Sequence, residues 1–153
     1  MLVFDTTAFI NGWNDHLPPV TFPSVWSAIG VALADARIIL VREVYREVLA
    51  QDDELKKWLN DWESVVVEPD EAVQRAAGEV AAMFPPEAGR HAADPFVLAE
   101  ARARGFTVVT YEGRNFSGER TRRWATKMPG VCQHFSIPCV TLPESLRMLG
   151  VSI

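Results

Sequence analysis

The stretch Met1-Leu-Val-Phe-Asp5-Thr-Thr-Ala-Phe-Ile10-Asn-Gly12 decides the fold. Leu2 to Phe4 are too few apolar residues for anything but a short strand that is buried on both faces. Asp5 follows this strand directly, and the polar pair Thr6-Thr7 opens a helical segment. A carboxylate at the carboxyl end of a buried strand lies where open parallel sheets place their active sites. The other interpretation is a helix cap, which is the more common role for a single aspartate at such a position.

Short apolar strands alternate with helices along the rest of the chain. Strands are predicted at 38–41, 65–67, 106–109 and 139–142, and helices at 24–36, 42–50, 52–62, 70–83, 94–104, 131–135 and from 143 onward. Such alternation requires βαβ crossovers, which build a parallel sheet with helices on both faces. The sequence therefore predicts an α/β fold, a three-layer α/β/α sandwich with a central parallel sheet, as a single domain over residues 1–153.

Charge and cysteine content argue against several classes of protein. The net charge of −5 disfavours generic electrostatic binding to nucleic acid, although a metal-binding carboxylate cluster would itself add negative charge. Cys132 and Cys139 cannot build a disulfide framework or a four-ligand zinc site, and the three histidines do not pair with them at zinc-finger spacing. No apolar run approaches the roughly 20 residues of a membrane helix. Asp5 interrupts any signal peptide, so we expect a cytoplasmic protein that makes no membrane contact.

Four acids stand out by position: Asp5, Glu47, Asp94 and Glu112. Asp94 opens a helix with Pro95 at its first position, a pattern that is also typical of an ordinary capped helix. Glu112 follows the strand at 106–109, where the alternative is a solvated strand end. Each acid alone favours its structural interpretation, and only their joint order along the chain points to a site.

Helical geometry favours Glu47 over Glu43 in the segment 42–50. With about 100° per residue, the apolar side chains of this segment spread over one broad face. Glu43 is predicted to project away from that face into solvent. Glu47 falls at the border of the face, where a side chain can be held in place. The alternative for Glu47 is a surface charge paired with an arginine.

The order of the four acids resembles that of the PIN domain nuclease family. The matching segments are Asp5-Thr-Thr-Ala-Phe-Ile10, Val44-Tyr-Arg-Glu47-Val48, Ala93-Asp94-Pro-Phe-Val-Leu-Ala99 and Val108-Val-Thr110-Tyr-Glu112. More narrowly, the segments 9–16, 52–58 and 127–132 resemble a bacterial PIN-like subfamily, the DUF4411 type. The family usually has aspartate at the position of Glu112, and a glutamate there could ligate a metal directly or through water.

The resemblance implies a metal-dependent endoribonuclease, the toxin of a bacterial toxin–antitoxin pair. Hard oxygen ligands without a histidine or cysteine partner suit Mg²⁺ or Mn²⁺. The four acids would be the catalytic and metal-binding residues, with Thr7 and Thr110 holding them or a bound water by hydrogen bonds. The implied partners are an RNA substrate, an antitoxin protein and a second copy of the chain in a homodimer.

The loop after Glu112 is locally basic in an acidic protein. Phe116 and Trp124 are interleaved with its cations, which are Arg114, Arg120, Arg122, Arg123 and Lys127. Cations suit phosphates, and aromatic rings can stack on unpaired bases. The alternatives are a solvated loop or a surface for an inhibitory partner.

Two other functions remain open. An aspartate after the first strand also occurs in phosphatases of the haloacid-dehalogenase type and in receiver domains, but the phosphatase pattern wants a second aspartate where this chain has Thr7. A receiver domain requires a lysine directly after one of its last strands, and Lys127 is poorly placed for that role. The other candidate is a non-catalytic PIN-like module that binds a partner through its acidic pocket or its tryptophan-rich helix.

Overall fold

The computed structural model describes residues 1–51, 53–82, 93–111 and 127–152, and within them four strands form one parallel sheet. The strands are β1 (Leu2–Phe4), β2 (Ile38–Ile39), β3 (Thr107–Val109) and β4 (Cys139–Val140), arranged in the order β2-β1-β3-β4. In the register of the central strands, Leu2 lies opposite both Ile38 and Thr107. All three residues of β1 are buried, as its purely apolar sequence predicts.

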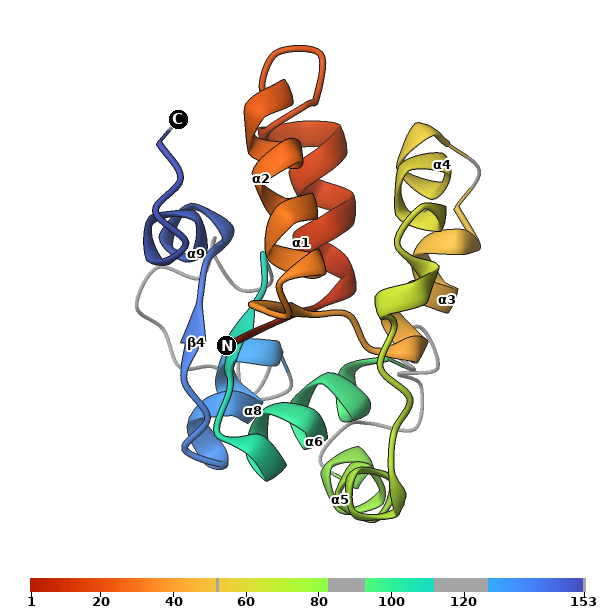
Figure 1. The fold of residues 1–153 in the computed structure, drawn as a ribbon. Helices are drawn as coiled ribbons and strands as arrows, with labels where there is room; N and C mark the ends of the chain where they lie inside the picture. The colour runs from red at the N-terminus through yellow and green to blue at the C-terminus, as the bar shows by residue number, and fades with distance from the viewer. Residues whose placement is uncertain (52, 83–92, 112–126, 153) are drawn as a thin grey trace.

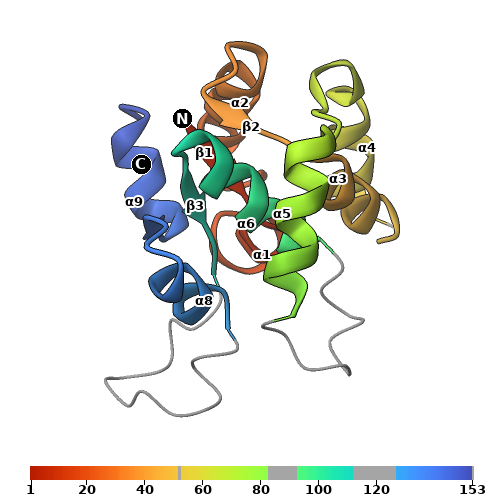
Figure 2. The same cartoon turned by 90° about the horizontal axis from the view of Figure 1, so that it is seen from below.

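Helices cover both faces of this sheet. They are α1 (Thr6–Asn11), α2 (Pro23–Ala34), α3 (Arg42–Leu49), α4 (Glu54–Asn60), α5 (Glu71–Ala81), α6 (Asp94–Arg104), α8 (Met128–His134) and α9 (Leu142–Met148). Figure 1 shows α1 and α2 on one side of the sheet and α5 and α6 on the other. In the view from below, α6 lies in front of β1, and α5 packs beside α6 (Figure 2). The predicted three-layer α/β/α fold is confirmed.

The strand order creates a crevice between the two central strands. From β1 the chain crosses to β2 on one side, and it later places β3 on the other side of β1. The chain leaves one of two adjacent strands toward one side of the sheet and the other strand toward the opposite side, so the two connections move apart at the carboxyl ends of these strands. Ligands of α/β proteins bind at this point. The backbone N–H of Asp5 donates to the carbonyl of Val109 at 3.0 Å, so β1 and β3 stay paired up to this edge.

Local capping signals set the ends of the helices next to the crevice. Asp5 is the N-cap of α1, and its side chain accepts a hydrogen bond from the backbone of Ala8. Helix α6 begins at Asp94, has Pro95 in its first turn and ends at Gly105. Gly105 has a φ of 71°, a left-handed conformation that glycine adopts without strain. The predicted end of α6 before Gly105 is confirmed, but Asp94 is the first helical residue and Ala93 the cap, so Pro95 is not at the first position and Asp94 is not a helix cap.

The predicted strand at 65–67 is wrong. Glu63–Val65 forms a short 3₁₀ turn, in which the N–H groups of Val65 and Val66 donate to carbonyls three residues earlier. Those donors are therefore not available for a sheet ladder. Val67 alone pairs, as an isolated parallel bridge with Val41 beyond the end of β2.

Several helix boundaries also differ from the prediction, and α8 begins at Met128, three residues before the predicted start. Helix α2 begins at Pro23, with Phe22 in the cap position, so Ser24 lies inside the helix and is not its cap. The fixed φ of proline suits the first helical position, which explains the earlier start. Helix α1 continues into a π-helical segment, Gly12–His16, closed by a hydrogen bond from Leu17 N to the carbonyl of Gly12 at 2.8 Å.

Four tryptophans pack against one another between α2 and α4. Trp26 lies 4.7 Å from Trp13 and 5.3 Å from Trp58, measured between ring centroids, and Trp58 lies 6.0 Å from Trp62. Their rings are inclined to one another, as aromatic pairs in protein cores prefer. The apolar stripe of the 52–62 segment is therefore packing surface, as predicted.

We expect the substitution Gly30→Ala in α2 to destabilise the protein. A Cβ at this position would lie 2.6 Å from Cζ2 of Trp62, so the indole would have to move. Overpacking of this kind costs about 1–3 kcal/mol, which exceeds the roughly 0.5–1 kcal/mol that alanine gains over glycine in a helix.

Gly78→Ala is the matched control, because a Cβ there meets nothing within 4 Å in the middle of α5. Thermal melts should give a lower midpoint for Gly30→Ala and a higher one for Gly78→Ala. Equal stabilisation of both variants would show that Trp62 does not pack closely against α2 at Gly30.

Among the helices that the structure describes, none is long and apolar enough to cross a membrane.

Candidate functional site

Asp5 is held rigidly at the carboxyl end of β1. Its side chain is 1% exposed. Its Oδ1 accepts a hydrogen bond from Ala8 N at 2.7 Å, and the hydroxyl of Thr7 lies 2.8 Å and 3.0 Å from the two carboxylate oxygens. The cap interpretation is therefore correct. A carboxylate offers about four acceptor positions, so the cap is compatible with a second role as a ligand, which stays a prediction.

Thr7 connects the loops that follow β1 and β3. Besides contacting Asp5, its Oγ1 lies 3.2 Å from Oγ1 of Thr110 and accepts a hydrogen bond from Tyr111 N at 3.0 Å. One hydroxyl thus ties together the carboxyl ends of the two central strands. The structure brings together the two threonines that were predicted to support the site.

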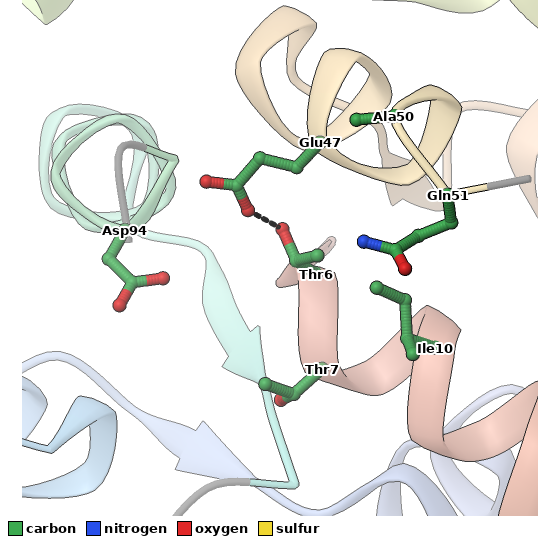
Figure 3. Close-up of a pocket in the computed structure, with 7 residues that line it drawn as sticks. All are labelled: Thr6, Thr7, Ile10, Glu47, Ala50, Gln51 and Asp94. Atoms are coloured by element: carbon green, nitrogen blue, oxygen red, sulfur yellow. Dashed lines mark hydrogen bonds between the residues drawn. The ribbon is translucent and has the colours of Figure 1, made fainter. Parts of the chain in front are cut away.

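Glu47 links three helices. One of its carboxylate oxygens accepts a hydrogen bond from the hydroxyl of Thr6 in α1 (Figure 3). The other accepts from the backbone N–H of Ala93 at 2.9 Å, directly before α6. A negative charge at a helix N-terminus is favourable, because the free N–H groups there carry partial positive charge. These contacts hold the carboxylate of Glu47 in one orientation.

The prediction that Glu43 is solvated holds only in part, because this residue is half-buried. Its Oε2 is buried and has no hydrogen-bond partner among the residues that the structure describes. Glu43 precedes Glu47 by four residues, so both side chains project from the same side of α3. That side faces neighbouring elements, as the contacts of Glu47 show, and the apolar pattern of α3 alone could not reveal this.

A pocket of about 320 Å³ lies in front of these acids. It is lined by Thr6, Thr7, Ile10, Glu47, Ala50, Gln51 and Asp94. Asp94 is 5% exposed and is the first residue of α6. Figure 3 shows the carboxylates of Glu47 and Asp94 turned toward the same space, with Thr6 and Thr7 beside them. Two acids from different helices therefore share one pocket, and Thr7, which also lines it, contacts Asp5.

The thiol of Cys132 lies within the electrostatic influence of two of the predicted acids. Its pKa is raised above the ordinary value first by the hydrogen bond with Cys139, then by burial and the charge of Cys139. The negative charges of Asp5 and Asp94 raise the pKa of Cys132 further. Both aspartates therefore act on the same buried thiol, and both cysteines are free.

The donor chemistry of the pocket fits Mg²⁺ or Mn²⁺. Both ions prefer oxygen ligands, and Mg²⁺ is usually held by one or two carboxylates together with water and substrate oxygens. Glu47 and Asp94 supply such a pair. Within residues 1–51, 53–82, 93–111 and 127–152, no three His, Cys, Asp or Glu side chains come close enough to hold a metal ion by themselves. The binding of one metal ion by three or four of the predicted acids therefore stays a prediction.

Several predicted site residues fall outside the described part of the chain. They are Glu112 and the basic residues Arg114, Arg120, Arg122 and Arg123. Lys127 is described and lies half-buried in the cap position before α8. The predicted substrate contacts of this loop therefore stay predictions.

The structure adds residues that the pattern of acids did not indicate. Thr6 and Ile10 line the pocket from α1, and Gln51 lines it just after the end of α3. Gln51 follows Glu47 by four residues, so helical spacing alone could have drawn attention to it. His16 stacks on Tyr111 with ring centroids 4.4 Å apart, and no sequence signal pointed to this contact.

One family model matches residues 2–153, and its description is "Domain of unknown function (DUF4411)". No curated protein matches the chain significantly. The match covers nearly the whole chain and its description names no activity. This match therefore does not test the resemblance to PIN domain nucleases.

Proposed function

We propose the following function for this chain, which belongs to the DUF4411 family: it is a metal-dependent endoribonuclease that hydrolyses phosphodiester bonds in RNA. The observation that most supports the proposal is the shared pocket of Glu47 and Asp94 at the carboxyl edge of the sheet. Thr7, which also lines this pocket, donates a hydrogen bond to Asp5 at the end of β1. The PIN-like order of these acids along the sequence agrees with this arrangement.

The charges in the pocket argue for a cation. Two carboxylates would repel a phosphodiester, so a phosphate can approach them only if positive charge lies between. Glu47 and Asp94 would hold Mg²⁺ or Mn²⁺, with Glu112 as a further predicted ligand. When bound, such an ion would polarise the phosphodiester, activate a water and neutralise the leaving oxygen.

The neighbouring polar groups would keep the acids in position. The hydrogen bonds from Thr6 and Ala93 to the two oxygens of Glu47 restrict rotation of its carboxylate. Thr7 does the same for Asp5. Groups that are fixed before the reaction need no reorganisation when charge develops at the phosphate, which is the main source of electrostatic catalysis.

In the cell, we propose that the protein is the toxin of a bacterial toxin–antitoxin pair and acts in the cytoplasm. An antitoxin protein would be its partner, RNA its substrate and a homodimer its assembly. The basic residues between 114 and 127 would contact RNA phosphates. This part of the proposal rests on the PIN-like sequence pattern.

Induced expression in bacterial cells tests the proposal. The wild-type chain should arrest growth and create new RNA 5′ ends at defined positions, which sequencing of RNA ends detects. Asp94→Asn, produced at the same level, should do neither. Normal growth with an unchanged set of RNA ends in cells that contain the soluble wild-type protein would contradict the proposal.

A non-catalytic binding module is the second candidate, and the contacts of Glu47 favour it. The same hydrogen bonds that could position a catalytic carboxylate also tie α1, α3 and the start of α6 together. Titration with Mn²⁺, followed by electron paramagnetic resonance, separates the two functions. The nuclease should bind Mn²⁺ at millimolar concentration or below, whereas a structural module should not. An aspartate-based phosphatase is disfavoured, because a nucleophile must be reachable and Asp5 is 1% exposed.

A further inference from the structure

The pocket has two chemically different ends. At one end lie the carboxylates of Glu47 and Asp94. At the other end, Ile10 and Ala50 supply apolar surface, and the side-chain amide of Gln51 lies beside them (Figure 3). A ligand that fills the whole pocket therefore needs a part that interacts with the acidic end and an uncharged, partly apolar part with hydrogen-bonding groups at its edge.

We propose that the end formed by Ile10, Ala50 and Gln51 is a subsite for one unpaired adenine base next to the RNA phosphate that is cleaved. The inference rests on the proposed nuclease function and adds a substrate preference to it. A nucleotide has the required two-part chemistry, because its phosphate is charged and its base is a flat, uncharged ring with polar edges.

The dimensions of the pocket suit one nucleotide and not a duplex. Its volume of about 320 Å³ is at the small end of the range of ligand sites, about 300–1,000 Å³. A base that enters such a pocket must be unstacked from its neighbours, and proteins read RNA sequence in this way on unpaired bases. Gln51 lies about one helical turn beyond Glu47, roughly 5 Å along the axis. This offset is comparable to the distance between a phosphate and its own base.

The amide of Gln51 selects the base. It offers one acceptor, the carbonyl oxygen, and donors on the NH₂ group. Adenine presents a matching donor and acceptor on both exposed edges, N6–H with N1 and N6–H with N7, and the second pair is the standard partner of glutamine in nucleic-acid recognition. Guanine matches the amide on its Watson–Crick edge, through O6 and N1–H, but offers only acceptors, O6 and N7, on its N7 edge, so adenine can pair in one more orientation. Cytosine and uracil cover less of the apolar surface of Ile10 and Ala50, because they have a single ring.

Oligouridine RNAs that carry a single A, G or C at one central position test this preference. Purified full-length protein with Mn²⁺ should cleave at the adenine about tenfold faster than at the other bases, since a bidentate contact to a base gives discrimination of this order. Gln51→Leu removes the hydrogen bonds at an exposed position after α3, and it should reduce the ratio to less than about twofold. Gln133→Leu, at an exposed position of α8, is the matched control and should keep the wild-type ratio.

Binding of the same oligonucleotides with 2′-O-methyl groups, which resist cleavage, gives an independent result. Wild-type protein should bind the adenine-containing strand more tightly, and Gln51→Leu should lose this difference. Equal cleavage and binding of the strands with A, G and C by the wild type would overturn the inference, as would an adenine preference that survives in Gln51→Leu. If the wild type cleaves none of the strands, the nuclease proposal fails, and the binding measurement still decides whether the subsite exists.

Discussion

Asp94→Asn should lower the rate of RNA cleavage on the order of a hundredfold or more without lowering the melting temperature. Asparagine has nearly the same shape as aspartate but lacks the charge that holds a cation in the pocket, and loss of one such electrostatic group typically has an effect of this size. The folded state should tolerate the change. Asp94 shares its pocket with Glu47, so neutralising it removes repulsion between two neighbouring carboxylates. Cleavage assays and thermal melts of the same preparations measure both effects.

Asp70→Asn is the matched control, since Asp70 also stands at a helix start but outside the pocket. Its carboxylate accepts a hydrogen bond from Val73 N at 2.9 Å and pairs with Arg104 at 2.8 Å. The Val73 N–H, followed by Arg104, lowers the pKa of Asp70 below its ordinary 3.8. The charge therefore stabilises the fold above that pH, and this stabilisation is lost as the pH falls through the lowered pKa.

The two variants should thus show opposite behaviour. Asp70→Asn should melt below the wild type at neutral pH, approach it in acid and cleave RNA at the wild-type rate. Asp94→Asn should keep its stability and lose cleavage. A strongly lowered melting temperature in Asp94→Asn would assign that carboxylate to the fold instead of the chemistry.

Thr7→Val should reduce both stability and cleavage. The valine side chain fills similar space but cannot donate to Asp5 or accept from Tyr111 N, so it leaves polar groups unpaired at the carboxyl ends of β1 and β3. An unsatisfied buried group costs about 1–3 kcal/mol. Without its hydrogen bond from Thr7, Asp5 also loses the contact that orients it, and cleavage should fall at least about tenfold.

Thr7→Ser keeps the hydroxyl and should restore most of both properties. Chemical denaturation and cleavage kinetics of the two variants separate the hydroxyl from the methyl group. If Thr7→Val has the same stability and cleavage rate as Thr7→Ser, the hydroxyl does not organise the site. The hydrogen bonds between the ends of the two central strands would then not contribute to function.

The fold could be predicted well where local signals and long-range packing agree. The apolar run Leu2 to Phe4, ended by Asp5, has no stable alternative to a buried strand, and β1 lies there. The Asp94-Pro95 start and the Gly105 stop fixed α6 because proline and glycine each restrict the backbone in one direction. The valines at 65–67 misled because β-propensity describes fit to a sheet, whereas here the preceding turn already binds two of the three backbone donors.

The site could be predicted only in part, for a physical reason. The acids were found because strand ends and helix starts meet at one edge of a parallel sheet, which is a property of the topology. The partners of Glu47 come from α1 and from the residue before α6, so they depend on how the helices pack. The burial of Glu43 Oε2 depends on the same packing, which the apolar pattern of α3 does not specify, whereas the four-residue spacing from Glu47 could have indicated Gln51.

The most direct test of the central claim is the cleavage of RNA by the purified full-length protein with Mn²⁺ and with an excess of EDTA. We predict discrete fragments with Mn²⁺, no fragments with EDTA and recovery when Mn²⁺ is added back in excess over the chelator. Asp94→Asn, purified in parallel, should give no fragments under any of these conditions. Intact RNA with the wild type in both Mg²⁺ and Mn²⁺, or equal cleavage by wild type and Asp94→Asn, would contradict the assignment of this pocket as a metal-dependent ribonuclease site.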